Sequence, residues 1–276
     1  FLIENENDLY ETTDAWYLRT LDVPESWCAS CVLVRFDGVY MDCDVLLNGH
    51  IVCTHHYGYT AFDVDLTSRL LVGRNTLAVH IRHQSPNSRW YSGAGIYRDV
   101  TLHVLPKRHI PLDGVYVTTT HELESWTMTI DTELCGVKDN GVLTHMLLDG
   151  DVPVCDVAVE AAGAQAKAVM QVLSPKLWSP DAPNVYTLQT MLGNQVIRQN
   201  VGFRDLTFTT DRGLLVNGAP VKLHGVCLHH DLGCLGSAFH EKAMRRQLRA
   251  MRQMGVNALR TSHNPPAKQV MDLCDE

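Results

Sequence analysis

The stretch VKLHGVCLHHDLGCLGSAFHEKAMRRQLRAMRQMGVNALRTSHNPP, residues 221–266, decides the fold of the C-terminal part of the chain. Residues 221–226 form a near-continuous apolar run, which is typical of a strand covered on both faces. Residues 238–254 then repeat apolar side chains at helical spacing, and Ser237 is placed to cap this helix. A second strand pattern follows at residues 256–261, and HNPP ends it before another helical pattern begins. Strand, helix, strand and helix in this order predict parallel β/α architecture.

Short strand patterns broken by turn residues fill the first part of the sequence. The alternating segment 31–53 contains Asn48-Gly49, a pair that favours a tight hairpin. The segment 65–81 reads as a second hairpin that turns at residues 73–75. Strands this short and this regularly spaced indicate a sandwich or a jelly roll.

A linker pattern at residues 106–111 precedes a second β region, in which YTLQTML (186–192) alternates apolar and polar residues. The chain is therefore predicted to be mainly β. We expect a sandwich or jelly-roll domain at residues 1–106, a second all-β domain of immunoglobulin-like size at 107–208, and the first two units of an incomplete parallel β/α domain at 209–276. Two parallel strands cannot close a barrel, so we expect the chain to end inside a domain.

The composition is that of a globular protein. The 276 residues include 23 basic and 31 acidic ones, giving a formal net charge of -8 without a Lys/Arg cluster. No stretch approaches the roughly 18 apolar residues of a transmembrane helix. We therefore expect neither nucleic acid nor a membrane as a partner.

Nine cysteines, an odd number without a paired spacing framework, favour a reducing compartment. We interpret them mostly as small buried apolar residues and expect a cytoplasmic protein. Because the chain begins at Phe1, a removed signal peptide, and with it secretion or a periplasmic location, stays open. Exposed edges of the two C-terminal strands should favour self-association, so a homo-oligomer is an expected state.

Polar clusters follow both C-terminal strand patterns. Residues 227–231 read CLHHD after the first strand, and residues 260–266 read RTSHNPP after the second. A (β/α)8 barrel carries its active site at the carboxyl ends of its strands, so these clusters lie where a barrel places function. The alternative is that the histidines are ordinary hydrogen-bonded loop residues.

A metal site is a second interpretation of the first cluster. Cys227, His229, His230 and Cys234 are ligand types, but their spacing C-x-H-H-x3-C matches no structural zinc pattern of paired ligands. We accordingly expect no metal and no cofactor. Asp231 is the only well-placed carboxylate, and one carboxylate does not supply a paired acid and base.

Five segments, in order along the chain, resemble landmarks of glycoside hydrolase family 2. They are RFDGVYMDCDVLLNG (35–49), RWYSGAGIYRDVTL (89–102), LWSPDAPNVYTL (177–188), GFRDLTFTTDRGLLVNGAPVKLHGVCLHHD (202–231) and MGVNALRTSHNPPAKQVMDLCDE (254–276). The resemblance implies a jelly-roll sugar-binding domain, an immunoglobulin-like sandwich and a (β/α)8 catalytic barrel. It also implies hydrolysis of β-galactosides, β-glucuronides or β-mannosides with retention, through two glutamates.

The resemblance assigns roles to four residues of the barrel segment. His229 and His263 correspond to histidines that contact the substrate, Arg260 to an arginine beside the nucleophile, and Asn264 is expected to assist. Both family glutamates lie on later barrel strands, beyond Glu276. We therefore expect no catalytic residue in this chain and no hydrolysis by it alone.

A loop of the first domain is also implicated. Arg89, Trp90 and Tyr91 resemble a family loop that reaches the rim of the active site. Some galactosidases and glucuronidases of the family have an acidic residue near this arginine, and the departure leaves the sugar open. The alternative is that Trp90 and Tyr91 are packing aromatics.

Three functional hypotheses follow, and the third is a metal-dependent protein that uses the cluster from Cys227 to Cys234. The first is that the chain is the N-terminal portion of a retaining β-glycosidase, with a β-galactoside as the favoured substrate. The second is a non-catalytic carbohydrate-binding or scaffold protein built from β-sandwiches, which predicts sugar affinity in residues 1–208 alone.

Overall fold

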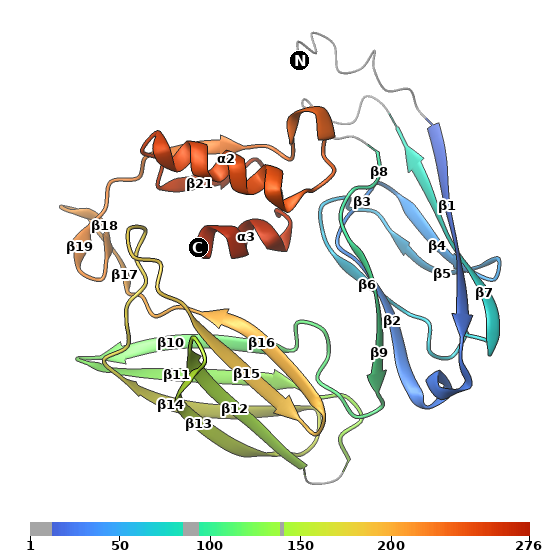
Figure 1. Cartoon of the computed structure of the whole chain (residues 1–276), viewed down its shortest axis with the longest axis horizontal. Helices are drawn as coiled ribbons and strands as arrows, with labels where there is room; N and C mark the ends of the chain where they lie inside the picture. The colour runs from blue at the N-terminus through green and yellow to red at the C-terminus, as the bar shows by residue number, and fades with distance from the viewer. Residues whose placement is uncertain (1–12, 85–93, 139–140) are drawn as a thin grey trace. The chain divides into compact units, whose positions relative to one another are not determined.

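The computed structural model describes residues 13–84, 94–138 and 141–276, and strands dominate it (Figure 1). It divides into two compact units. The first unit comprises Phe1–Pro106 and His224–Cys274, and the second comprises Lys107–Leu223 with Asp275–Glu276. The predicted mainly β fold class, with sandwich domains followed by the start of a parallel β/α domain, is confirmed.

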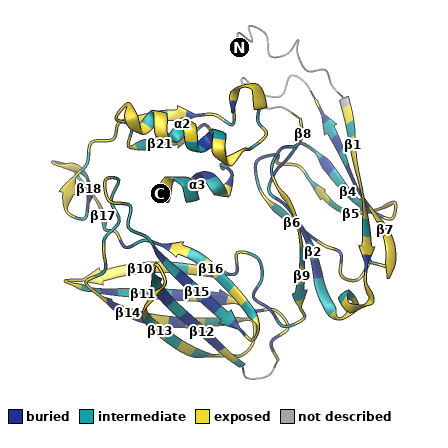
Figure 2. Cartoon of the chain, viewed as in Figure 1, coloured by how far each residue is buried: buried dark blue, intermediate teal, exposed yellow. Residues whose placement is uncertain are grey.

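The jelly roll of the first unit consists of antiparallel sheets. One has the order β1-β7-β4-β5, with β1 at Thr13–Val23, β7 at Gly73–His83, β4 at Cys43–Leu47 and β5 at His50–His55. Another has the order β6-β2-β9, with β6 at Phe62–Asp65, β2 at Ser30–Phe36 and β9 at Val100–Pro106, and a two-stranded sheet pairs β3 (Val39–Tyr40) with β8 (Gly95–Ile96). A short 3-10 helix, η1, spans Glu25–Ala29. Phe36, Val45, Leu66 and Ile81 are at most 1% exposed and belong to the core of this domain. Buried residues are dark blue in Figure 2.

The hairpin predicted at Asn48-Gly49 is present, and both residues adopt the positive φ that this turn requires, 51° and 84°. The hairpin predicted at residues 73–75 is wrong. β7 begins at Gly73 and pairs with β1 and β4, whereas β6 pairs with β2 in the other sheet. The Asn75 carboxamide, 1% exposed, is bonded to Leu71 and Gly73 instead of forming a two-strand turn.

The second unit contains the immunoglobulin-like sandwich. One sheet has the order β10-β11-β14, with β10 at Val115–Glu122, β11 at Ser125–Glu133 and β14 at Gln165–Leu173. The other has the order β13-β12-β15-β16, with β13 at Val152–Ala161, β12 at Gly141–Asp149, β15 at Tyr186–Leu192 and β16 at Gln195–Val201. Phe203 lies in the core at 0% exposure and meets the rings of Trp126 and Tyr186 edge-on, at centroid distances of 5.6 and 5.3 Å.

A small antiparallel sheet closes the second unit. It has the order β17-β18-β19, with β17 at Leu206–Thr209, β18 at Gly213–Val216 and β19 at Ala219–Pro220. Asn217-Gly218 makes the predicted turn between the last two strands, with φ values of 53° and 77°.

The C-terminal segment of the first unit has the predicted order of strand, helix, strand and helix. β20 (Gly225–Leu228) and β21 (Ala258–Thr261) pair in parallel, α2 (Glu241–Gln253) connects them, and α3 (Lys268–Asp275) follows. A 3-10 turn, η2, lies at Gly233–Leu235.

The first strand begins later than the pattern 221–226 predicted. The Val221 amide donates to Leu214 O at 2.9 Å, so this residue still belongs to the preceding hairpin. Pairing with the second strand starts only at His224, whose N–H donates to Asn257 Oδ1 at 2.8 Å. Leu223 between them is 58% exposed, so this apolar run is not covered on both faces.

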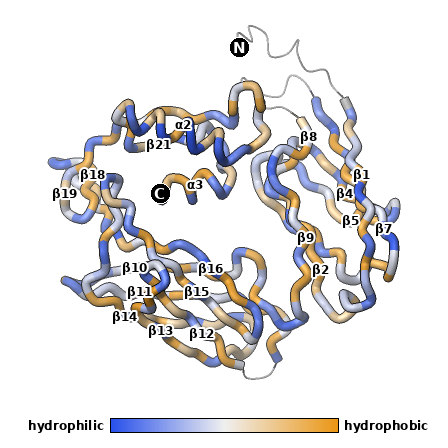
Figure 3. Tube along the Cα trace, in the orientation of Figure 1, coloured by the Kyte–Doolittle hydropathy of each residue, from blue (hydrophilic) through white to orange (hydrophobic). Residues whose placement is uncertain are grey.

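The helix also begins later than predicted, at Glu241, and Ser237 does not cap it. The Phe239 amide donates to Tyr97 O at 3.1 Å, and His240 is extended, so the chain cannot become helical before this point. The predicted apolar stripe is present: Met244 is buried, and Leu248 and Met251 pack beside it. Figure 3 shows the corresponding alternation of polar and apolar residues along α2.

The cysteines are more exposed than the sequence suggested. Of the nine cysteines only Cys43 is buried, and five are exposed: Cys28, Cys135, Cys227, Cys234 and Cys274. The interpretation of most of them as buried apolar residues is therefore wrong.

Candidate functional site

Two loops leave the parallel strands side by side at their carboxyl ends. Leu228 and Thr261 are register partners at the last position of β20 and β21, and the Ser262 amide extends the pairing to Leu228 O at 2.9 Å. His229 and His263 come next on their respective loops. Their rings meet edge to face with centroids 5.9 Å apart, so the two predicted histidines share one site.

Arg260 is the second-last residue of β21, directly before this site. It is register partner to Cys227, and its Nη1 lies 3.9 Å from Cys227 Sγ. The Ser262 hydroxyl and then the Arg260 guanidinium hold the pKa of the Cys227 thiol below its ordinary value. The electrostatic environment at this strand end therefore favours an anion.

Asn264 receives its contact from the jelly roll. The Tyr57 hydroxyl donates a hydrogen bond to Asn264 Oδ1. The amide Nδ2 of Asn264 is buried, and within the described ranges no acceptor contacts it. Sequence reasoning missed Tyr57, because nothing in a linear pattern links it to a residue so far along the chain.

His230 lies in the wall of this site and packs against the jelly roll. Its ring lies 4.9 Å from that of Tyr59. Burial, with added repulsion from Arg98 and His229, lowers the pKa of His230 to about 4, so it is neutral near neutral pH. This histidine is a packing residue of the site's wall.

Arg98 is a second residue that the sequence did not single out. Its guanidinium donates to three backbone carbonyls: Pro265 O at 2.8 Å, Tyr59 O at 3.1 Å and Asp37 O at 3.3 Å. Burial lowers its pKa from the ordinary value. Arg98 thus ties the jelly roll to the loop that carries His263 and Asn264.

A small pocket lies next to the two histidine loops. Its lining includes Tyr97, Arg98, His229, His230, Thr261 and Pro266. Side chains of the jelly roll and of the β/α segment therefore meet around one depression of the first unit.

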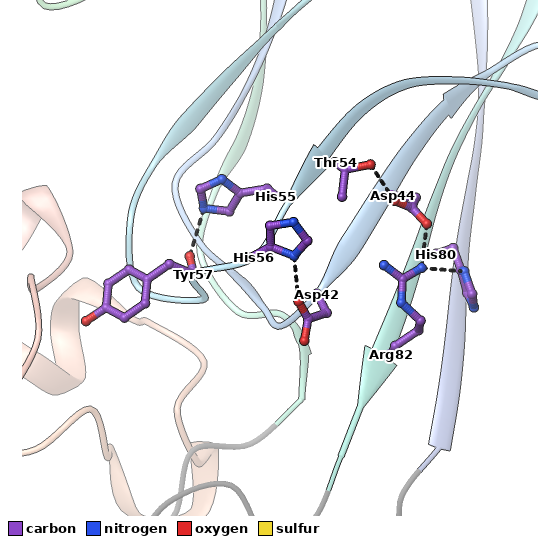
Figure 4. A network of polar contacts seen from close by, with 8 residues as sticks. All are labelled: Asp42, Asp44, Thr54, His55, His56, Tyr57, His80 and Arg82. Atoms are coloured by element: carbon purple, nitrogen blue, oxygen red, sulfur yellow. Dashed lines mark hydrogen bonds and ion pairs between the residues drawn. The ribbon is translucent and has the colours of Figure 1, made fainter.

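The jelly-roll loop that carries Tyr57 is anchored by a polar network, which Figure 4 shows. His55 Nε2 donates to Tyr57 O at 2.7 Å, and His56 Nδ1 lies 2.8 Å from Asp42 Oδ1. Next to it, Asp44 accepts hydrogen bonds from Arg82 and Thr54, and the Arg82 bond is the main cause of its lowered pKa. The ring of Tyr57 points away from these strands, towards the ribbon of the C-terminal segment.

The other predicted site features fare differently. Arg89, Trp90 and Tyr91 lie outside the described residues. Asp231 accepts the Gly233 amide at 2.7 Å in a local turn. In the described part of the chain, no three His, Cys, Asp or Glu side chains gather to hold a metal ion, so Cys227, His229, His230 and Cys234 form no metal-binding cluster.

None of the described helices has the length and apolar character needed to cross a membrane.

Three family models match consecutive parts of the chain. They are "Glycosyl hydrolases family 2, sugar binding domain" at residues 3–106, "Glycosyl hydrolases family 2" at 109–204, and "Glycosyl hydrolases family 2, TIM barrel domain" at 208–276. The chain belongs to glycosyl hydrolase family 2. The resemblance stated from the sequence is confirmed.

Named relatives and solved structures of family 2 agree. The chain is 37% identical over 277 residues to Beta-galactosidase BoGH2A of Bacteroides ovatus, a match that covers 94% of this chain and 32% of that protein. A crystal structure of a beta-glycosidase from Bacteroides vulgatus matches with a TM-score of 0.89 and 35% identity, over 95% of this chain and 35% of that one. The Bacteroides uniformis beta-glucuronidase matches with a TM-score of 0.87 and 30% identity, over 98% and 36%. The chain spans about a third of the length of these family 2 relatives.

Proposed function

We propose that this chain is the N-terminal portion of a retaining β-glycosidase that hydrolyses terminal β-galactosides or related β-glycosides. One observation carries the proposal. His229 and His263, with Arg260 and Asn264 beside them, follow two neighbouring parallel strands at the same end, where (β/α)8 barrels place their chemistry.

Each of these groups has a role in sugar hydrolysis. The two histidines can donate and accept hydrogen bonds with sugar hydroxyls. Arg260 is a fixed cation that would keep a neighbouring carboxylate ionised. After the Ser262 hydroxyl, it is the second cause of the lowered pKa of the Cys227 thiol.

The reaction itself needs two carboxyl groups about 5–5.5 Å apart, one to protonate the leaving group and one to attack the sugar. In our proposal both belong to later strands of the barrel, which the sequence of 276 residues does not include. The 276-residue chain alone would then hydrolyse nothing.

The choice of sugar is part of the proposal. Relatives named for β-galactosidase and for β-glucuronidase activity are both similar to this chain. We favour a β-galactoside because a relative with that name shares 37% of its residues over 94% of this chain. We also propose a cytoplasmic location, which the odd number of nine cysteines without a paired spacing framework supports.

The test is hydrolysis by the complete gene product. We expect release of p-nitrophenol from p-nitrophenyl β-D-galactoside, with the β-anomer of galactose as the first product in proton NMR. His263→Ala should lower kcat/KM by about 10- to 100-fold, through loss of hydrogen bonds to the sugar.

The matched control is His50→Ala, which removes an exposed histidine at a jelly-roll turn and should leave kcat/KM unchanged. Absence of hydrolysis for the galactoside, glucuronide and mannoside would overturn the proposal. Galactose binding by residues 1–208 in that case would favour the non-catalytic carbohydrate-binding alternative.

A further inference from the structure

We propose that Tyr57 of the jelly roll is a positioning residue that fixes the Asn264 carboxamide so that its NH2 group donates to one hydroxyl of the sugar. This inference rests on the proposed function. Through Tyr57, the jelly roll would contribute to substrate specificity, although it does not touch the sugar itself. The same contact would give the Asn264 side chain a defined orientation.

The direction of the Asn264 amide follows from its hydrogen bonds. A phenolic O–H that donates must meet the carbonyl oxygen of the carboxamide, so the Tyr57 contact assigns Oδ1 to the jelly-roll side. The NH2 group is then on the side of the carboxamide that does not contact Tyr57. It is buried, and in the part of the chain that the structure describes it has no acceptor.

A buried donor without an acceptor costs free energy, so native proteins rarely keep one without a reason. Asn264 directly follows His263, whose ring meets that of His229 at the strand ends. An acceptor supplied by a ligand at this point removes the cost. The hydroxyl oxygens of a sugar are acceptors of this kind.

Tyr57 is suited to this task because its loop is held from several sides. His55 Nε2 donates to Tyr57 O at 2.7 Å, and the Tyr97 hydroxyl donates to Gly58 O at 2.8 Å. Arg98 binds Tyr59 O and also Pro265 O, so one guanidinium holds both loops. A Cβ at Gly58 would overlap the ring of Tyr40, which shows how closely the backbone is packed here. The phenol is therefore presented at a fixed place. The Asn264 NH2 group is covered by neighbouring protein atoms, so these atoms have to shift when the sugar binds.

The test uses the complete gene product, p-nitrophenyl β-D-galactoside and the monodeoxy analogues of that galactoside. Tyr57→Phe keeps the ring and removes only the hydroxyl. We expect it to lower kcat/KM by about 5- to 10-fold, mainly through KM, as expected for one misplaced neutral hydrogen bond. Asn264→Ala should lose at least as much, and the double variant should lose no more than Asn264→Ala alone.

The specific signature is a change in discrimination between hydroxyls. The wild-type protein should hydrolyse one monodeoxy analogue distinctly less well than the parent substrate because that analogue lacks the acceptor. Tyr57→Phe and Asn264→Ala should both lose this preference, whereas a merely structural defect would lower all substrates alike. Tyr116→Phe, at a tyrosine 67% exposed on β10, is the matched control and should change nothing.

The failure of this inference differs from the failure of the proposed function. If the wild-type protein hydrolyses the galactoside but Tyr57→Phe is indistinguishable from it, or if the losses of the two variants multiply, Tyr57 does not position Asn264. If the wild-type protein hydrolyses no β-glycoside, the proposed function falls first, and this inference falls with it.

Discussion

His145 is a buried titratable residue far from the candidate site in sequence, in strand β12 of the immunoglobulin-like sandwich. Its Nδ1 shares a 2.9 Å hydrogen bond with Thr190 Oγ1, the side chain is 0% exposed, and Nε2 has no partner among the described residues. Burial lowers the pKa of His145 from 6.5 to about 4. The unfolded chain therefore binds a proton that the folded sandwich resists.

The sign of the pH dependence follows. The contribution to stability is complete above about pH 6.5 and is lost as the pH falls towards about 4. We expect the free energy of unfolding of the sandwich to decrease by about 2–3 kcal/mol across this window, as measured by urea denaturation.

The control is His145→Leu, which should remove this part of the pH dependence although it costs some packing. Replacing exposed His50 with Gln should leave the dependence intact. An unchanged slope in His145→Leu would show that other groups cause the acid sensitivity.

At the level of residues, the sequence identified part of the site. His229, His263, Arg260 and Asn264 were found because they follow strand patterns and match family segments, although their roles stay predictions. Tyr57 was not found, because its contact with Asn264 depends on tertiary structure that no local spacing encodes.

At the level of helices and strands, features with a local cause were predicted from the sequence, and features that depend on distant contacts were not. The apolar spacing of α2 predicted its buried stripe, because helical periodicity is a local property. Its first residue could not be predicted, since the Tyr97 carbonyl captures the Phe239 amide and delays the helix. The strand pattern at 221–226 likewise could not show that Val221 bonds to Leu214 of the preceding hairpin.

The stripe of α2 permits a matched test. Met244 is 4% exposed and packs with Leu228 and Val270, whereas Met254, just after the helix, is 78% exposed. Met244→Ala should lower the free energy of unfolding of the first unit by about 2–5 kcal/mol because it leaves a cavity. Met254→Ala should stay within about 0.5 kcal/mol of the wild type.

Chemical denaturation of both variants, followed by circular dichroism, checks this expectation. Equal effects of the two substitutions would mean that α2 does not pack through the Met244 face.

At the scale of the whole molecule, the two units differ in how the chain builds them. The second unit is nearly continuous, Lys107–Leu223, and has its own aromatic core around Phe203. We expect residues 107–223, expressed alone, to fold with a β-type circular dichroism spectrum and a single cooperative thermal transition.

A gradual, non-cooperative melt of this piece would contradict its independence. Phe203→Ala in the same piece provides an internal check, since removal of this fully buried ring should cost about 3–5 kcal/mol. Phe208→Ala, at a phenylalanine 80% exposed, is the matched control.

The contacts of the Arg98 guanidinium determine which substitutions the loops around it tolerate. The guanidinium donates hydrogen bonds to the backbone oxygens of Asp37, Tyr59 and Pro265. These bonds depend on the course of the backbone and not on which side chains the three residues carry. Side chains in these loops can therefore be substituted while the three hydrogen bonds of Arg98 stay in place. Exchange of the entire jelly roll is different, because a shift of the Pro265 loop relative to Arg98 would leave the buried guanidinium without one of its acceptors. Single substitutions in these loops should accordingly be tolerated more readily than replacement of the whole jelly-roll domain.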